Sequence, residues 1–472
     1  MADAAAALDL RRRELLRRMS PLQGEVADWS QRALNVEEFK LHKSQIDALG
    51  ELMNIYFTRQ SALAAALEPA PPTGQYEQGL FDLASAVVAA QRAWSFFREK
   101  LDLRTAVNVK DNLRLADIVA IDCYDTVCRV ALEKGFIAND AVREPPLTYL
   151  TPDFSPMTWP RGSRPNDGQS ESLPGQKLPI PVIELPWDQI QNPWELLAIH
   201  HEVAHDIEAD LGLRADLTSA LKTQLQKQAD ITPERQRRWA GWQSEILADL
   251  VAMQLGGPAF AEMLMNFLLL PADKVTTIVL GDEHPNHYLR IQLLVADIRI
   301  MAQQAIADPQ FSTRLQAHAT RIETLWSSLY AATDSLTPYL PDFPAVIGAL
   351  MDTVLPSLGN QMTLRQLIPY ASQHDADIRQ AADIFAAGSQ VTFPMAARHA
   401  VAAARLAASQ VSGSDQKLAS VAQNSGVLIS KGAPVGLRRL PADFTAGPTA
   451  RRARLERFVD AHLNTPQLSV PP

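Results

Sequence analysis

The run His201-Glu202-Val203-Ala204-His205 (HEVAH) lies in a stretch whose apolar spacing predicts a helix over residues 192–210. Two histidines four positions apart lie one turn apart on the same face of an α-helix. Both imidazoles can therefore bind one metal ion, and the carboxylate of Glu202 can reach a water molecule on that ion. Asn192 suits the N-cap of this helix, and Gly212 follows its expected end.

A third metal ligand is needed, because a catalytic zinc ion has three protein ligands and one open position. Glu245 is the candidate, on a helix predicted over residues 233–255. Asp249 lies one turn later on the same face, where it can accept a hydrogen bond from a ligand histidine. The apolar neighbours Ile246 and Leu250 predict that this face is packed, and a packed carboxylate needs a partner. The alternative is a solvated helix face that carries these residues by chance.

A further segment, HPNHYLRI (residues 284–291), follows at the start of another predicted helix. His284 and Arg290 have the chemistry to stabilise the negative oxygen of a tetrahedral intermediate. Two alternatives stay open: His284 can serve only as a helix N-cap, and Tyr288 can donate the hydrogen bond in its place.

The ordered set HEVAH (201–205), EILAD (245–249) and HPNHYLRI (284–291) resembles the three signature segments of the M48 metallopeptidases. These are gluzincins that include the HtpX-type membrane proteases and the CAAX prenyl proteases. The resemblance covers roughly residues 180–300. Membrane members of the family have hydrophobic spans around these segments, whereas residues 214–240 here are strongly polar. The resemblance therefore implies a relative that has no membrane span.

The resemblance also assigns roles to individual residues. The matching positions are His201, His205 and Glu245 as zinc ligands, Glu202 as general base, Asp249 as the acid behind the ligands, His284 as the histidine that stabilises the intermediate, and Arg290 as the arginine of the last segment. It implies a zinc-dependent endopeptidase whose substrate is a peptide or protein.

Composition limits the other classes of function. The chain has 472 residues, 47% of them hydrophobic, and a formal charge of −9, which argues against a nucleic-acid binder. Cys123 and Cys128 are five residues apart on a predicted helix and do not face each other, so we expect reduced thiols. Residues 1–18 lack the order of a signal peptide, and the most apolar run, 263–270, is too short for a span. We expect a cytoplasmic protein.

The predicted fold is mainly α, with a helical N-terminal bundle and a zincin-like helical catalytic core that carries a short edge strand or small sheet. Ile180–Leu185 is the predicted edge strand, because prolines flank and interrupt it. The expected parts are a helical bundle at 1–140, a proline-rich segment at 141–192 with that strand and a possible lid at 161–175, a metallopeptidase core at 193–307, a helical region at 308–410, and a partly disordered tail at 411–472 with a helix at 449–463.

Besides the peptidase, two other readings stay open: a protein without catalytic activity, and a hydrolase with another substrate. About 350 residues lie outside the segments that resemble the peptidases, more than peptide hydrolysis needs. The chain can therefore be a catalytically silent zinc-binding scaffold, or a regulatory protein whose helical flanks bind a protein partner. A metal-dependent hydrolase that acts on a non-peptide amide is the third reading.

Overall fold

The computed structural model describes residues 2–33, 35–67, 74–138, 143–163, 178–279, 281–411, 413–432 and 448–463. Most of these residues are helical, and three short strands form one small sheet. The predicted class, mainly α with a short sheet, is confirmed. Most of the predicted lid, from residue 164 onward, lies outside the described residues.

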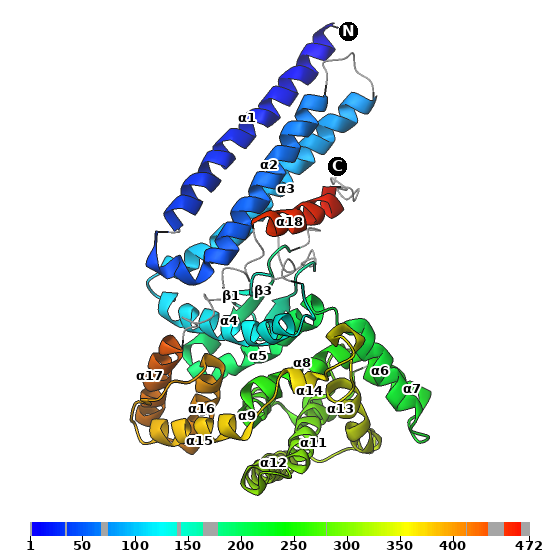
Figure 1. Ribbon diagram of the computed structural model, residues 1–472, viewed down its shortest axis with the longest axis vertical. Helices are drawn as coiled ribbons and strands as arrows, with labels where there is room; N and C mark the ends of the chain where they lie inside the picture. The colour runs from blue at the N-terminus through cyan, green and yellow to red at the C-terminus, as the bar shows by residue number, and fades with distance from the viewer. Residues whose placement is uncertain are drawn as a thin grey trace.

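Three long helices, α1 (Ala2–Ala33), α2 (Lys43–Ala66) and α3 (Gly74–Asp102), lie side by side and form an arm that projects from the rest of the molecule (Figure 1). Trp29 of α1 packs edge-on against Trp94 of α3, with ring centroids 5.4 Å apart. Both rings are buried, so the arm has an apolar core of its own. None of the predicted site residues lies in this arm.

The C-terminal helix α18 (Pro448–Leu463) lies against α2, so two distant parts of the chain meet on the arm (Figure 1). Val459 of α18 is fully buried in the apolar core of the arm. Arg451 of α18 donates a hydrogen bond of 2.9 Å to Glu51 of α2. The helix predicted near the C-terminus is therefore present, and apolar packing and an ion pair both hold it.

The sheet has the strand order β1-β3-β2, formed by β1 (Leu147–Thr151), β2 (Met157–Trp159) and β3 (Val182–Pro186). Strand β3 pairs in parallel with β1 and antiparallel with β2. The prediction of an edge strand at residues 180–185 is thus wrong, because β3 is the central strand and is buried along its length. The prolines that suggested an edge precede the strand or end it, so none breaks its interior.

The sheet joins the arm to the helical body (Figure 1). Val182 of β3 packs into the apolar core of the arm. Its neighbour Ile183 points to the opposite face and packs into the core of the body. That core also contains α4 (Lys110–Glu133) and α5 (Ala198–Asp210), which pack against each other. Helix α4, which we expected in the N-terminal bundle, therefore contributes its apolar face to the body.

The other elements are short 3₁₀ helices and body helices. They are η1 (Glu37–His42), η2 (Leu103–Thr105), η4 (Gln189–Gln191), η5 (Pro193–Leu197), α6 (Arg214–Gln226), α7 (Pro233–Gly241), α8 (Gln243–Gly256), α9 (Pro258–Phe267), α10 (Ala272–Thr276), α11 (His287–Gln304), α12 (Pro309–Leu329), η6 (Thr337–Asp342), α13 (Phe343–Met351), η7 (Pro356–Leu358), α14 (Leu364–Leu367), α15 (Ser372–Ala386), α16 (Ala397–Gln410) and α17 (Asp415–Lys431).

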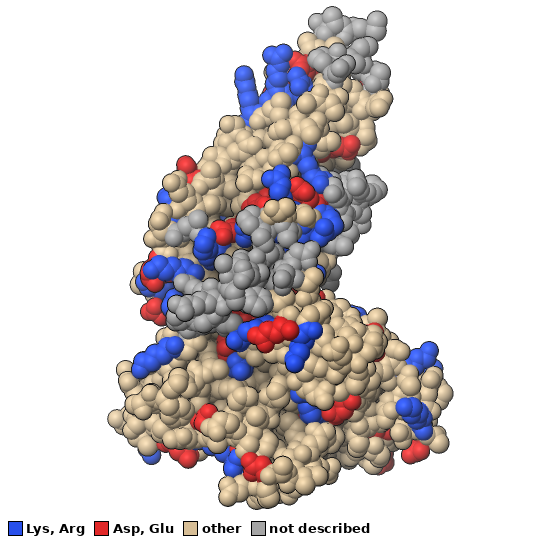
Figure 2. All heavy atoms as spheres, in the orientation of Figure 1, with Lys and Arg blue, Asp and Glu red and all other residues tan. Residues whose placement is uncertain are grey.

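Three further features are the apolar character of the helices, the state of the two cysteines and the distribution of surface charge. Within the described ranges, no helix combines the length and the apolar character that crossing a bilayer requires. Cys123 is buried, Cys128 is partly buried, and neither forms a disulfide. On the face shown in Figure 2, basic and acidic side chains are interspersed over both arm and body.

Candidate metal centre

The HEVAH run occupies the middle of α5, as predicted. The helix is entered through the 3₁₀ turn η5, and the side chain of Asn192 does not cap it but donates to Glu195 at 3.3 Å. Gly212 follows the end of α5 with a φ of +64°, which favours glycine. Val203 and Ile207 are buried in the body core and hold the helix in place.

The helix predicted over residues 233–255 is two helices, α7 and α8, with a break at Trp242. Thr232 caps the first through a hydrogen bond from the backbone of Arg235. After α8 the chain turns at Gly257, which has a φ of +65°. A Cβ atom there would lie 2.2 Å from the ring of Tyr370, so only glycine fits this corner. Helix α8 is thereby held against α5.

Three predicted ligands come together between α5 and α8. Atoms of His201, His205 and Glu245 that can bind a metal lie within 4.8 Å of one another. Nε2 of His201 is 3.2 Å from Oε2 of Glu245, and Nε2 of His205 is 3.5 Å from Oε1 of the same carboxylate. In the described part of the chain, no other histidine, cysteine or carboxylate residues form such a group.

These distances place the three side chains close enough to share one metal ion. Bonds of about 2.0–2.2 Å from zinc to nitrogen or oxygen place neighbouring ligand atoms about 3.3–3.6 Å apart at the corners of a tetrahedron. The contacts of 3.2 and 3.5 Å are made by two different oxygens of Glu245, and the shorter one is also a hydrogen bond. Two imidazoles and one carboxylate also leave the fourth position open, which is the donor set of a catalytic site and not of a structural one.

Asp249 fixes the ring of His201, as its spacing predicted. Oδ1 of Asp249 is 2.9 Å from Nδ1 of His201, which leaves Nε2 to face Glu245. Arg290 donates two hydrogen bonds of 2.8 Å to the same carboxylate, through Nε and Nη2. The oxyanion role that we considered for Arg290 stays a prediction, since both contacts are with Asp249. The structure shows a guanidinium that holds the acid behind a ligand histidine.

A second pair of residues, which the sequence analysis missed, fixes His205. Its Nδ1 lies 3.3 Å from Oγ of Ser244, and that hydroxyl donates to Glu208 at 2.7 Å. A hydroxyl that donates to a carboxylate can accept from the imidazole, so Nε2 of His205 is free to face Glu245. Arg214 in turn donates to Glu208 at 2.9 Å. The only sequence signal was position: Ser244 directly precedes the third ligand.

The protonation states at the cluster follow from burial and from these contacts. Burial lowers the pKa of His205 to about 4, so this imidazole is neutral at pH 7. Burial also acts to lower the pKa of His201, but its hydrogen bonds to Asp249 and Glu245 outweigh burial and raise it to about 10. The pKa of Glu245 is well below its usual range, because hydrogen bonds to His201 and His284 outweigh burial. A metal ion would replace the proton of His201.

Glu202 and His284 complete the group. Burial raises the pKa of Glu202 to about 7, although the charge of His201 opposes the shift, and the side chain is only 5% exposed. Nε2 of His284 lies 3.1 Å from Oε2 of Glu245, and the ring is 48% exposed, so it borders the cluster on the solvent side.

Of the two alternatives for residues 284–291, the N-cap role of His284 is wrong, because another residue caps the helix. The N-cap of α11 is Asn286, whose side chain accepts from the backbone of Tyr288 at 2.9 Å, and not His284. Tyr288 is buried, and its burial and the charge of Glu323 of α12 raise the pKa of its hydroxyl, so its role as a donor stays a prediction.

Searches with models of protein families, among curated proteins and among solved structures found no match to this chain. No relative therefore assigns a role to any residue. The features that bear on function are the three sequence segments and the geometry that brings their residues together.

Proposed function

We propose that this chain is a zinc-dependent metallopeptidase of the gluzincin type, acting on peptide bonds. The observation that carries the proposal is the clustering of His201, His205 and Glu245, whose metal-binding atoms lie within 4.8 Å of one another. The rings are held by Asp249 and Ser244, so their orientation does not depend on the metal. A preformed set of three donors beside a buried glutamate is what metal-assisted hydrolysis requires.

The residues divide the chemistry among them. A zinc ion bound here would lower the pKa of a water molecule and polarise the scissile carbonyl. Glu202 takes a proton from the attacking water and passes it to the leaving amine, a role that suits a buried carboxylate whose pKa is raised by its burial. His284, exposed at the border of the cluster, is placed to donate to the oxygen that becomes negative. Asp249 and Arg290 keep His201 in the required tautomer.

A zinc-binding scaffold without activity is the second candidate. One observation favours it: the arm and the helices after α11 make up much of the chain and contain none of the predicted site residues. Glu202 distinguishes the two, because a metal held only for structure or for partner binding has no use for a buried base beside it. Both candidates predict bound zinc, so only turnover separates them.

The test is proteolysis by the zinc-loaded chain. Wild type, Glu202→Gln and the control Glu195→Gln are incubated with unfolded casein, and new peptide termini are identified by mass spectrometry. Glu195 lies on η5, outside the cluster. We expect Glu202→Gln to bind zinc normally and to cleave about 10²–10⁴-fold more slowly, while Glu195→Gln matches wild type. Equal cleavage by wild type and Glu202→Gln would contradict the mechanism. No cleavage by a zinc-loaded wild type would favour the scaffold.

A further inference from the structure

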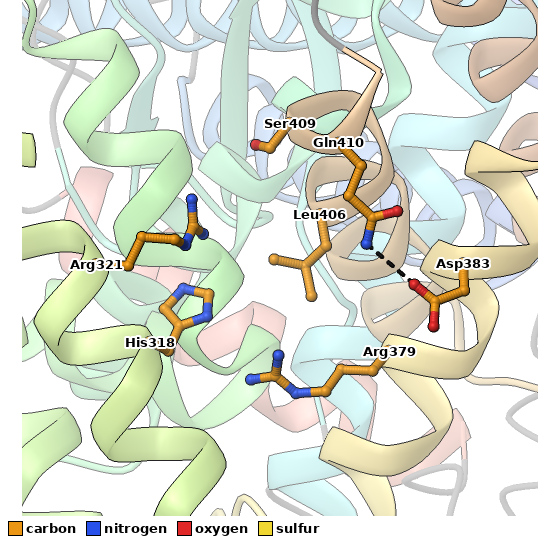
Figure 3. Close-up of a pocket in the computed structure, with 7 residues that line it drawn as sticks. All are labelled: His318, Arg321, Arg379, Asp383, Leu406, Ser409 and Gln410. Atoms are coloured by element: carbon orange, nitrogen blue, oxygen red, sulfur yellow. Dashed lines mark hydrogen bonds between the residues drawn. The ribbon is translucent and has the colours of Figure 1, made fainter.

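A cavity of about 350 Å³ lies among α12, α15 and α16, apart from the metal cluster (Figure 3). His318 and Arg321 of α12 form one wall, Arg379 of α15 forms another, and Ser409 of α16 closes it. The cavity and the metal cluster share α9 but no side chain. Phe260 of that helix stacks at 6.5 Å on the ring of His201, whereas Glu262 lies among the cavity residues.

The Nε atom of Arg379 is held by an aspartate, whereas its terminal nitrogens point into the cavity (Figure 3). Its Nε donates to both oxygens of Asp375, at 3.0 and 3.1 Å. Arg314 donates to the same carboxylate at 2.6 Å, so one negative charge is shared by two guanidinium groups. Figure 3 shows the terminal nitrogens of Arg379 reaching into the cavity toward His318 and Arg321. The donor fork of Arg379 is therefore presented to whatever occupies the cavity.

The opposite wall is organised around a buried carboxylate. Glu262 pairs with Arg321, lies 2.9 Å from Nε2 of His318, and accepts a hydrogen bond of 2.9 Å from Ser409. At the rim, the carboxylate of Asp383 accepts from Gln410 of α16 at 3.1 Å. Glu262 is thus engaged by the wall, and the lining combines Asp383 at the rim with the guanidinium groups of Arg321 and Arg379.

The cations influence one another across the cavity. Burial lowers the pKa of Arg321, and the charges of Arg379 and Arg405 lower it further. Burial, followed by the charge of Arg379, lowers the pKa of His318 to about 4, so this ring is neutral at pH 7. Positive charges that repel each other at this range are relieved by an anion between them.

We propose that this cavity binds the phosphate group of a small phosphorylated molecule. Arginine forks bind phosphate oxygens in pairs, and two arginines from different helices suit a doubly charged group better than one carboxylate. The volume of about 350 Å³ is that of a site for a small molecule and not for a protein segment. The site is independent of the proposed peptidase activity, because none of its side chains belongs to the metal cluster.

Calorimetric titration of the full chain tests the proposal without any activity assay. The probes are inorganic phosphate, glycerol phosphate and succinate, each at constant ionic strength. We expect saturable binding of both phosphates and weaker binding of succinate. Arg379→Gln should weaken phosphate binding by at least about tenfold, since a hydrogen bond to a charged group is lost. Arg299→Gln is the matched control, because Arg299 is an exposed arginine paired with Glu323 outside the cavity.

Arg321→Gln keeps the test valid if Arg379→Gln does not fold. The side chain of Arg321 is 51% exposed, and its buried partner Glu262 keeps its contacts with His318 and Ser409, so circular dichroism should show an intact fold. A tenfold loss in this variant also supports the proposal. The proposal is overturned if wild type shows no saturable binding up to about 10 mM phosphate. It is overturned equally if both cavity variants bind like wild type, or if succinate binds as tightly as the phosphates.

Discussion

Two clusters in this molecule each contain a histidine, an aspartate and an arginine. They differ in the partner of the second ring nitrogen of the histidine. In the first, Nε2 of His42 lies 3.0 Å from Asp117, and Arg104 donates to the same carboxylate at 2.7 Å. The other ring nitrogen of His42 lies 3.2 Å from the side chain of Gln45. All three side chains are 1–2% exposed. Arg104 also donates to the backbone carbonyls of Lys100 and Thr148, so the cluster joins η1, η2 and β1 to α4 and is fully occupied by structural contacts.

The second cluster has the same three residue types, but the second ring nitrogen of its histidine does not face a neutral side chain. Asp249 is again held between an arginine, Arg290, and a histidine, His201. Here the second ring nitrogen of His201 faces a carboxylate, Glu245, that also faces His205. A buried set of histidine, aspartate and arginine is therefore not by itself a sign of function. The sign is a ring nitrogen that points at other metal-binding atoms.

The largest effect that separates the two clusters should come from Asp117→Asn. Removing this charge leaves Arg104 buried without its counter-ion, which costs about 3–5 kcal/mol of unfolding free energy. Urea unfolding measures it, with Asp82→Asn, an exposed site on α3, as the control that should change by less than about 0.5 kcal/mol. The zinc content per folded chain should not change. A variant that keeps its stability, or that loses zinc, would show that the first cluster is not purely structural.

The matching change in the second cluster, Asp249→Asn, should act on the metal. Its loss frees the ring of His201 and removes the partner of Arg290, so we expect about a 10–100-fold weaker zinc affinity. Competition with a fluorescent chelator measures this affinity, and Asp82→Asn again serves as the control. Unchanged affinity in the folded variant would mean that Asp249 does not orient the ligand.

The smallest effect should come from Ser244→Ala. This change removes a neutral acceptor behind His205, together with the hydroxyl's hydrogen bond to Glu208, and leaves the ligand set whole. We expect zinc to bind about two- to tenfold more weakly, less than the loss in Asp249→Asn. The same chelator competition ranks the two variants. A larger effect of Ser244→Ala would place the main support of the site behind His205 and not behind His201.

The parts of the site that could be predicted from sequence are those set by helical spacing. His201 and His205 lie one turn apart on α5, and Glu245 and Asp249 one turn apart on α8, whatever the rest of the fold does. The convergence of the two helices was inferred from the order of the segments, and the structure brings those residues together.

What could not be predicted depends on contacts between distant residues. The central place of β3 follows from its pairing with β1, about 35 residues earlier, which no local pattern shows. Residues 214–226, expected as a polar link, are helical because Leu217 and Leu221 are buried one turn apart. The first cluster joins His42 to a residue 75 positions away. The contact of Arg290 with Asp249 likewise appears only when α11 lies beside α8.

The most direct test of the central claim is the metal content of the purified chain, measured by mass spectrometry for wild type and Glu245→Ala in parallel. Glu323→Ala, at a half-buried site on α12 where the side chain pairs with Arg299, is the matched control. The account predicts about one zinc ion per chain in wild type and in the control, and almost none in Glu245→Ala. Wild type without metal after zinc is supplied, or Glu245→Ala with as much zinc as wild type, would contradict the three-ligand site and the peptidase proposal with it.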